Sequence, residues 1–449
     1  MNDTTQGFKS LTNPQKVTNC QCWIYQTLFL YLWIEQTKSI YQYFYMKKFF
    51  FLAAALISIA ALAQPQGPMP KPEDKGEGFQ FTVVKELPIT SVKNQASTGT
   101  CWCFSTISFL ESEAIRKGCK DPDLDLSEMY VVSNSYADKA VKYIRVDGNL
   151  NYEQGSSFGD VIYALRDHGI VPNVEMPGLN YGTDRHMHGE LIAGLKGYLQ
   201  GILKNPNRKL SSAWLNGLKG ILAAYLGPIP EKFTYKGVEY TPQSYLKALN
   251  INPDDYIDFT SWTHLSYYEK HPVEVADNWR WESAYNLPLD EFISIIDYAI
   301  NNGYTVAWAS DVSEQGFTRN GVGLVPDMDA IQKQAEEAGS DQAHWLGITA
   351  PGARPSFDRP VPELTITPEL RQQGYEEKTT TDDHGMHIYG IAKDQKGNKY
   401  YMVKNSWGET GKYKGLWYVS EAYVRYKTMD LMVHKDAIPK DIKKKIGIK

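Results

Sequence analysis

Cysteine is scarce in this chain, with five in 449 residues, and only Cys101, Cys103 and Cys119 lie beyond residue 63. Cys103 and Cys119 are separated by 16 positions of a segment with helical periodicity, which places them about 24 Å apart, too far for a disulfide. No second Cys or His pair stands at ligand-like spacing from Cys101 and Cys103. The scarcity therefore excludes a disulfide framework, and we predict neither a metal centre nor a cofactor.

A strong charge of one sign and long basic runs are lacking as well. The chain carries 52 acidic and 47 basic residues, a formal net charge of −5, so nucleic acid is not an expected partner. No internal repeat is present. Hydrophobic residues make up 42% of the chain, which at this length is enough to bury one large core or the cores of two lobes.

The apolar run at residues 49–60 is short for a membrane span, which needs about 20 residues. A basic Met-Lys-Lys precedes the run and Ala-Leu-Ala follows it, so residues 46–63 have the form of a secretory signal peptide. We therefore predict export to the periplasm or out of the cell, with no stable membrane association after cleavage. An uncleaved membrane anchor is the alternative.

The signal peptide sets the expected domain boundaries. Residues 1–45 are interpreted as translated upstream sequence, with a second membrane-associated segment at 23–34 as the alternative. Residues 64–78 are rich in Pro, Gly and Lys and are expected to form a flexible lead-in. Residues 79–449 then form the functional domain.

Residues 94–104, Asn-Gln-Ala-Ser-Thr-Gly-Thr-Cys-Trp-Cys-Phe, place Gln95 six positions before Cys101. The apolar positions that follow predict a helix that begins at Cys101 and ends before Gly118. A helix N-terminus favours the thiolate, which is the nucleophilic form of cysteine. Cys101 is therefore the candidate nucleophile, and Gln95 with the Cys101 N–H is the candidate oxyanion hole.

Two later motifs supply partners for this thiol. His384 stands in Asp-His-Gly-Met at the start of a predicted strand, and Asn405 follows a second strand in Asn-Ser-Trp-Gly. Because His384 and His387 differ by an odd number, they face opposite sides of their strand, and only one can meet the thiol. An Asn oxygen can accept the imidazole N–H and fix its tautomer. Because the small residue that follows His384 in Asp-His-Gly-Met resembles the pattern of the papain superfamily, His384 is predicted as the general base and acid. Asn405 is predicted as its orienting residue.

Simpler interpretations compete with this assignment. An isolated cysteine is more often a core residue, and Cys103, two positions along the helix, is the better candidate for that role. His387 is expected to be a packed or exposed strand histidine. His186 and His188 with Asp184 would suggest metal-dependent hydrolysis, but no third His or Glu stands at ligand spacing nearby.

The order Cys, His, Asn and the flanks of each motif resemble the papain-like cysteine peptidases. The resemblance implies an α+β, papain-like two-lobed fold with a helical lobe and an antiparallel β lobe. It also implies that Trp407 shields the His–Asn hydrogen bond and that Gly155 and Trp407 border the substrate, while Ser156 replaces a second glycine of the cleft wall. Helical periodicity within the long stretch between the cysteine and histidine motifs predicts a large, mainly helical insertion at about 180–300.

Several shorter segments are similar to the bleomycin hydrolase and aminopeptidase C branch of that family. They lie at residues 126–130, 169–172, 277–279, 285–290 and 309–312. The branch implies a homohexamer and a C-terminal tail whose carboxylate pairs with the free amine of the substrate. Here the tail, residues 440–449, is short and basic, so a solvated, disordered end is as well supported as a tail that fills the cleft.

The sequence therefore predicts a secreted cysteine peptidase that acts on peptides through a Cys-His-Asn triad and an acyl-enzyme, with aminopeptidase activity first. An endopeptidase with an open cleft is the first alternative. An inactive papain-fold protein that only binds peptides is the second.

Overall fold

The computed structural model describes residues 78–338 and 357–448, so the predicted upstream extension, signal peptide and most of the lead-in lie outside the described residues. The helices of the described part are α2 (Cys101–Arg116), α3 (Glu128–Arg145), α4 (Phe158–His168), α5 (Gly189–Leu203), α6 (Ala213–Leu226), α7 (Pro242–Ala248), α8 (Leu289–Asn301), α9 (Met328–Ala338), α11 (Pro368–Glu376), α12 (Glu421–Lys427) and α13 (Lys440–Ile446). Within these residues, no helix is both long and apolar enough to cross a membrane.

Strands from many parts of the chain form one large sheet. They are β1 (Thr82–Glu86), β4 (Tyr256–Thr260), β5 (Lys270–Pro272), β6 (Ser283–Asn286), β7 (Val306–Ser310), β8 (Phe317–Thr318), β9 (Val322–Gly323), β10 (His384–Lys393), β11 (Lys399–Lys404), β12 (Leu416–Ser420) and β13 (Thr428–His434). Their order is β5-β6-β4-β13-β7-β10-β11-β12-β9-β8, with β1 paired to β10. The pairs β4–β6 and β9–β12 are parallel and the others antiparallel, so the sheet is mixed rather than wholly antiparallel as expected.

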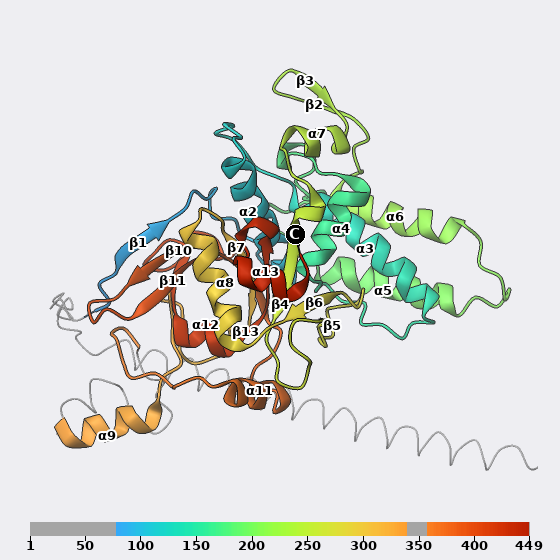
Figure 1. The fold of residues 1–449 in the computed structure, drawn as a ribbon. Coiled ribbons are helices and arrows are strands. Elements are labelled where there is room, and N and C mark those ends of the chain that lie inside the picture. Colours follow the sequence, from blue (N-terminus) through green and yellow to red (C-terminus); the bar gives the residue numbers. More distant parts are fainter. Residues whose placement is uncertain (1–77, 339–356, 449) are drawn as a thin grey trace, which may run out of the picture. The chain divides into compact units, whose positions relative to one another are not determined.

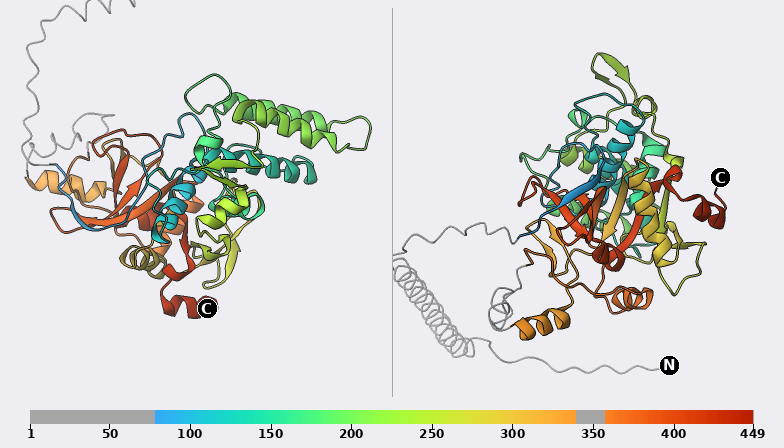
Figure 2. Two further views of the ribbon diagram at one scale, coloured as in Figure 1. Left: turned by 90° about the horizontal axis from the view of Figure 1, so that it is seen from above. Right: turned by 60° about the vertical axis from the view of Figure 1, so that its left-hand side comes forward.

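A group of helices lies beside the sheet and forms its own core with α2. Figures 1 and 2 show α3, α5 and α6 extending together away from the strands. In α5, leucines at 191, 195 and 199 are buried, and in α6 leucines at 218, 222 and 226 are buried. This spacing of four puts each set on one face of its helix, and burying a leucine is worth about 1.5–3 kcal/mol.

The predicted insertion divides into two structurally different parts. Up to Ala248 it consists of α5, α6 and α7 with a small hairpin, β2 (Phe233–Tyr235) and β3 (Val238–Tyr240), between the last two helices. From Tyr256 onward the chain instead adds β4, β5 and β6 to the edge of the large sheet before α8. The helical part is therefore shorter than the predicted 180–300.

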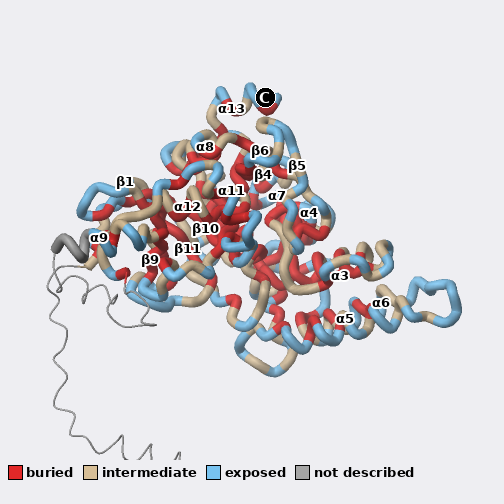
Figure 3. The backbone as a smooth tube through the Cα atoms, turned by 90° about the horizontal axis from the view of Figure 1, so that it is seen from below, coloured by how far each residue is buried: buried red, intermediate tan, exposed pale blue. Residues whose placement is uncertain are grey.

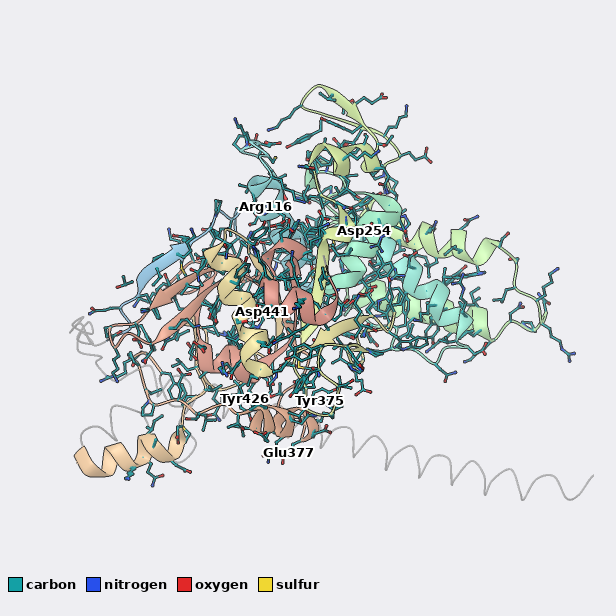
Figure 4. The ribbon with its side chains drawn as sticks, in the orientation of Figure 1. Arg116, Asp254, Tyr375, Glu377, Tyr426 and Asp441 are labelled. Atoms are coloured by element: carbon teal, nitrogen blue, oxygen red, sulfur yellow. The ribbon has the colours of Figure 1, made fainter. Side chains whose placement is uncertain are left out.

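A second core lies between the sheet and α8, α12 and α13. In Figure 3, buried residues gather along β10 and β11, whereas α5 and α6 present many exposed positions. On α13, which carries the labelled Asp441 in Figure 4, Ile442 and Ile446 join this core. Lys445 Nζ binds Glu291 Oε1 of α8 at 2.8 Å. The interpretation of the tail as a solvated, disordered end is therefore wrong for residues 440–448, because two isoleucines at helical spacing anchor it.

Candidate active site

The cysteine motif opens α2, as its sequence predicts. Gly99 N donates to Gln154 Oε1 at 2.8 Å and Trp102 Nε1 donates to the Gln154 carbonyl at 3.1 Å, so a neighbouring loop fixes the turn before the helix. At the other end, Gly118 has a φ of +99°, and the N–H groups of Gly118 and Cys119 bond back to Ile115 and Ala114. This Schellman arrangement ends the helix one turn beyond the core. Cys101 therefore lies at the N-terminal end of a well-terminated helix.

The imidazole of His384 is held by two residues of the Asn-Ser-Trp-Gly segment. His384 begins β10, and its Nε2 lies 2.7 Å from Asn405 Oδ1. The indole of Trp407 stacks on the imidazole, with ring centroids 4.7 Å apart. Strands β10 and β11 are antiparallel neighbours, which brings a residue that starts one strand beside a residue that follows the other. Because Nε2 faces Asn405, Nδ1 is the nitrogen left for a reacting group.

Cys101 and His384 border one cavity of about 140 Å³. Burial raises the pKa of the Cys101 thiol to about 11, against hydrogen bonds from the N–H groups of Gly385 and Trp102 that favour the thiolate. Burial likewise lowers the pKa of His384 to about 4, against its hydrogen bond to Asn405. Burial therefore favours the neutral form of each group. Transfer of the thiol proton to the imidazole would form a thiolate and an imidazolium, which attract each other. The positive N-terminal end of α2 would stabilise the thiolate.

Gln95 is buried close to these residues and makes several hydrogen bonds of its own. Its Nε2 donates to the Thr98 carbonyl at 2.7 Å, and its Oε1 accepts from Ser406 Oγ at 2.6 Å. One amide proton is thus committed to Thr98 and the other remains for an oxyanion. The cavity is lined by Cys101, His384 and Gly155, but Gln95, Asn405 and Trp407 are not among the described residues of its wall.

Gly155 and Ser156 also line this cavity. Gly155 O accepts from Lys139 Nζ at 2.8 Å, and Ser156 Oγ accepts from the indole N–H of Trp279 at 2.7 Å. The serine that replaces a glycine therefore has a structural partner of its own. Gly155 is among the residues that line the cavity, whereas Trp407 stacks on His384 and is not among the described lining residues.

Several functional candidates escaped the sequence analysis. Six carboxylates line the same cavity, namely Asp258, Asp277, Glu282, Asp382, Asp383 and Asp430. They come from β4, from the segment before β6, from the residues before β10 and from β13. Single acidic residues scattered over 170 positions form no local motif, and only the alternation of Asp258 and Asp430 within apolar strands could have drawn attention to them.

The competing residues take structural positions. Cys103 is fully buried and its Sγ contacts the Glu128 carbonyl at 3.3 Å. His387 is also fully buried, with Nδ1 2.9 Å from Ser108 Oγ of α2. His186 and His188 pack edge to face against each other, and the described residues contain no group of three or more His, Cys, Asp or Glu that could hold a metal ion. Cys101, Cys103 and Cys119 are free thiols.

Two sequence-family models match the two ends of this site. The model described as "Papain family cysteine protease" matches residues 79–156, and the "Peptidase C1-like family" matches residues 372–448. The first range contains the cysteine motif and the second contains the histidine and asparagine motifs. The region between them, which includes α5 and α6, is covered by neither match.

Longer similarities extend over most of the chain. Aminopeptidase G of Lactobacillus delbrueckii subsp. lactis is 21% identical over 79% of this chain and 83% of its own length. Aminopeptidase C of the same organism is 24% identical, over 80% and 82% respectively. The crystal structure of PepW from Lactobacillus rhamnosis HN001 superposes with a TM-score of 0.60 at 21% identity, covering 82% of this chain and 84% of that one, which confirms the predicted fold.

Proposed function

We propose that this chain, which belongs to the papain-like cysteine peptidases as a distant member of the peptidase C1-like family, is an aminopeptidase that removes residues from the free amino end of peptides. The observation that carries the aminopeptidase activity is the extent of the similarity. Aminopeptidases match about four-fifths of this chain and four-fifths of their own length, so the likeness includes the region between the catalytic motifs.

The proposed mechanism begins with proton transfer from the Cys101 thiol to Nδ1 of His384. The thiolate attacks the scissile carbonyl carbon, and the Cys101 N–H with the free amide proton of Gln95 stabilises the oxyanion. The His384 imidazolium then gives its proton to the leaving amine, and an acyl-enzyme remains on Cys101. His384 next takes a proton from water while the water oxygen attacks the acyl carbon. The bond from that carbon to Cys101 sulfur then breaks, and His384 returns the proton to the sulfur.

Asn405 and Trp407 serve this mechanism without touching the substrate. The 2.7 Å bond from His384 Nε2 to Asn405 Oδ1 keeps the imidazole in one tautomer and one orientation through both proton transfers. The stacked indole of Trp407 shields that bond from water, and a hydrogen bond of this kind is stronger in a medium of low dielectric constant. Both residues are therefore positioning residues.

Location and assembly are further parts of the proposal. The signal-peptide pattern at residues 46–63 supports export to the periplasm or the outside of the cell, and the family resemblance supports a homohexamer. Amino-terminal sequencing of the native protein tests the first, since a mature chain that begins at residue 64 is expected. A native chain that retains residues 46–63 would contradict it.

Endopeptidase activity is the second candidate, and one observation favours it. The described tail residues, 440–448, pack on α8 and are not among the residues that line the cavity at Cys101. A tail carboxylate that reads the substrate amine, as the resemblance implies, therefore has no counterpart within the described residues.

One experiment separates the two candidates. Purified protein, kept reduced, is assayed with two fluorogenic peptides of identical sequence, one with a free amine and one with an acetylated amine. Cleavage of the free-amine peptide alone supports the aminopeptidase, whereas equal cleavage of both supports the endopeptidase. Cys101→Ala protein is the control for a contaminating peptidase, and wild-type protein without activity on either peptide would favour a binding protein.

A further inference from the structure

The cavity beside the reaction centre has an unusual charge. Six carboxylates line it, and its described lining contains no lysine and no arginine. The only other ionisable side chains in the lining are Cys101 and His384. A peptidase that bound only uncharged peptide groups here would have no use for so many carboxylates, because like charges gathered in one cavity repel each other.

Two of the carboxylates are built into the sheet. Asp258 lies opposite Met432 in the β4–β13 pair, so Asp430, two positions from Met432, is on the same face of the sheet. Asp430 pairs with Ala309 of β7, which in turn pairs with Gly385 of β10. Ala309, Gly385 and Asp430 all line the cavity, and Gly385 packs closely against the start of α2.

Glycines on the opposite wall make room for further carboxylates. A Cβ atom at Gly155 would lie 1.6 Å from Asp277 Oδ2, and one at Gly159 would lie 1.5 Å from Glu282 Oε2. No side chain fits at either position while those carboxylates stay in place. The wall is therefore shaped around its acidic groups, which argues against an incidental accumulation of charge.

Two of these groups each have one buried oxygen atom without a hydrogen-bond partner among the described residues. Asp258 Oδ1 and Glu282 Oε1 are buried and accept no hydrogen bond from the described residues. Burial together with repulsion from Asp430 raises the pKa of Asp258 well above its usual range. Each oxygen is thus an unsatisfied acceptor in the wall of the cavity, and a cation is the ligand that would satisfy it.

Nearby cations of the protein are committed elsewhere. Lys139 Nζ donates to the carbonyls of Glu153 and Gly155, and Arg280 pairs with Asp138 and Asp160. Lys270 lowers the pKa of Asp258 only in part. None of the three is among the lining residues, so no cation of the described residues lies in the cavity.

We propose that the carboxylates of Asp258, Asp382 and Asp430 bind a cationic nitrogen of the peptide substrate and so place its scissile bond at Cys101. This inference rests on the proposed function, which names the α-ammonium group of the substrate as the source of the cation. A lysine or arginine side chain next to the scissile residue offers the same chemistry. In either case, two carboxylates of the sheet, Asp258 and Asp430, and one just before β10, Asp382, perform the recognition that the family resemblance assigns to a tail.

The position of Asp382 connects this recognition to the reaction. Asp382 stands two residues before His384, and its charge, with that of Asp277, raises the pKa of the Cys101 thiol. A cation bound among these carboxylates offsets their repulsion of the thiolate. Substrates that carry the cation are therefore expected to react faster as well as bind more tightly.

Four fluorogenic substrates distinguish the two sources of the cation. They are an alanyl amide with a free amine, its N-acetyl form, an N-acetyl-lysyl-alanyl amide and the matching N-acetyl-norleucyl-alanyl amide. The test variants are Asp430→Asn, Asp258→Asn and Asp382→Asn. Asp254→Asn is the matched control, because Asp254 (Figure 4) lies four positions before Asp258 but forms an exposed pair with Arg166.

If the α-ammonium group is the ligand, only the free alanyl amide is cleaved well, and each test variant lowers its kcat/KM by about 10- to 100-fold, mainly through KM. If a basic side chain is the ligand, the lysyl substrate exceeds the norleucyl one by about tenfold or more, and the test variants abolish that ratio. The second result retains the acidic site but contradicts the proposed aminopeptidase. If every folded test variant keeps the wild-type ratios of kcat/KM among the four substrates, the proposed acidic site is wrong. A preference for the free amine could still exist in that case, with a different cause.

Binding without turnover provides an independent measurement. Cys101→Ala protein is titrated calorimetrically with alaninamide, N-acetylalaninamide and N-acetyl-lysinamide, alone and with each Asp→Asn change. Binding of a cationic probe that weakens about tenfold or more in the Asp variants supports the site. Equal binding or no binding of all three probes contradicts it, whatever the catalytic assay shows. Asp382→Asn, outside the sheet, keeps the test possible if a strand variant fails to fold.

Discussion

The two histidines of β10 provide the most informative comparison in this molecule. His384 and His387 are three residues apart, both are buried, and burial lowers the pKa of both. Around His384 the neighbours are Asn405, Trp407 and an acidic cavity. Around His387, Ser108 is the hydrogen-bond partner of Nδ1, and the buried Nε2 has no partner in the part of the chain that the structure describes. Burial alone therefore does not mark the functional residue, whereas an orienting partner and access to a cavity do.

Removal of His384 should have the largest effect of any single change considered in this comparison. His384→Ala takes away the group that moves protons in both halves of the proposed reaction, so kcat/KM is expected to fall by about 10³-fold or more. Steady-state assays of folded protein, checked by circular dichroism and melting temperature, give the measurement. Retention of more than about a tenth of wild-type kcat/KM would exclude His384 as the general base.

The acidic surroundings of His384 should also make substrate binding depend on pH. Burial raises the pKa of Asp430 to about 7, and desolvation with repulsion from Asp430 and Asp277 raises the pKa of Asp382, which is more exposed than Asp430. As the pH falls through this range both groups gain protons and lose the charge that attracts a cation. KM for a free-amine substrate is therefore expected to rise about tenfold between pH 7.5 and pH 6.

The blocked-amine substrate is the control for that measurement, since its KM should stay nearly constant over the same range. Above about pH 8 the substrate amine itself loses its proton, and KM for the free-amine substrate should rise again. The other charged groups around the cavity shift the pH at which KM changes but do not alter the direction of the change. They are Asp258, Asp277, Glu282 and Asp383 in the lining, and Lys139, Lys270 and Arg280 outside it. A KM that falls on acidification would contradict a cation site here.

The comparison also explains what could be predicted from the sequence. The helix that begins at Cys101 follows from local signals, namely apolar spacing and a C-terminal glycine. The two-residue repeat of a strand separates His384 from His387, and the resemblance of Asp-His-Gly-Met to the papain superfamily pattern chooses between them. The proximity of His384 and Asn405 requires only that two strands be neighbours. Features of this kind can be predicted from local sequence because the contacts involved lie within one helix or strand or between adjacent ones.

The acidic cavity and the tail were not predicted, for two different physical reasons. The glycines at 155 and 159 acquire their meaning only when Asp277 and Glu282 approach them from more than 100 residues away, and no sequence pattern reports such an approach. The tail carried a usable signal, because Ile442 and Ile446 are four apart and Gly447 follows them. Its high lysine content obscured that signal, although lysines on the outer face of a helix are compatible with an apolar inner face.

Replacement of His387 should have the smallest effect on activity. His387→Leu keeps a side chain of similar volume in a fully buried site, so the free energy of unfolding at pH 7 should change by less than about 1.5 kcal/mol and kcat/KM by less than about threefold. Because folding lowers the pKa of His387, the unfolded chain binds the extra proton as the pH falls below about 6.5, and wild-type stability declines there.

The variant lacks that proton site, so its loss of stability between pH 7 and pH 5 should be smaller than that of the wild type. Urea unfolding at both pH values measures the difference, and Ser108→Ala, which removes the partner but keeps the histidine, is the matched control. Loss of more than about 100-fold in kcat/KM by a stably folded His387→Leu protein would show that both histidines act in the reaction. The distinction between a partnered histidine at the cavity and a packed one behind it would then have to be abandoned.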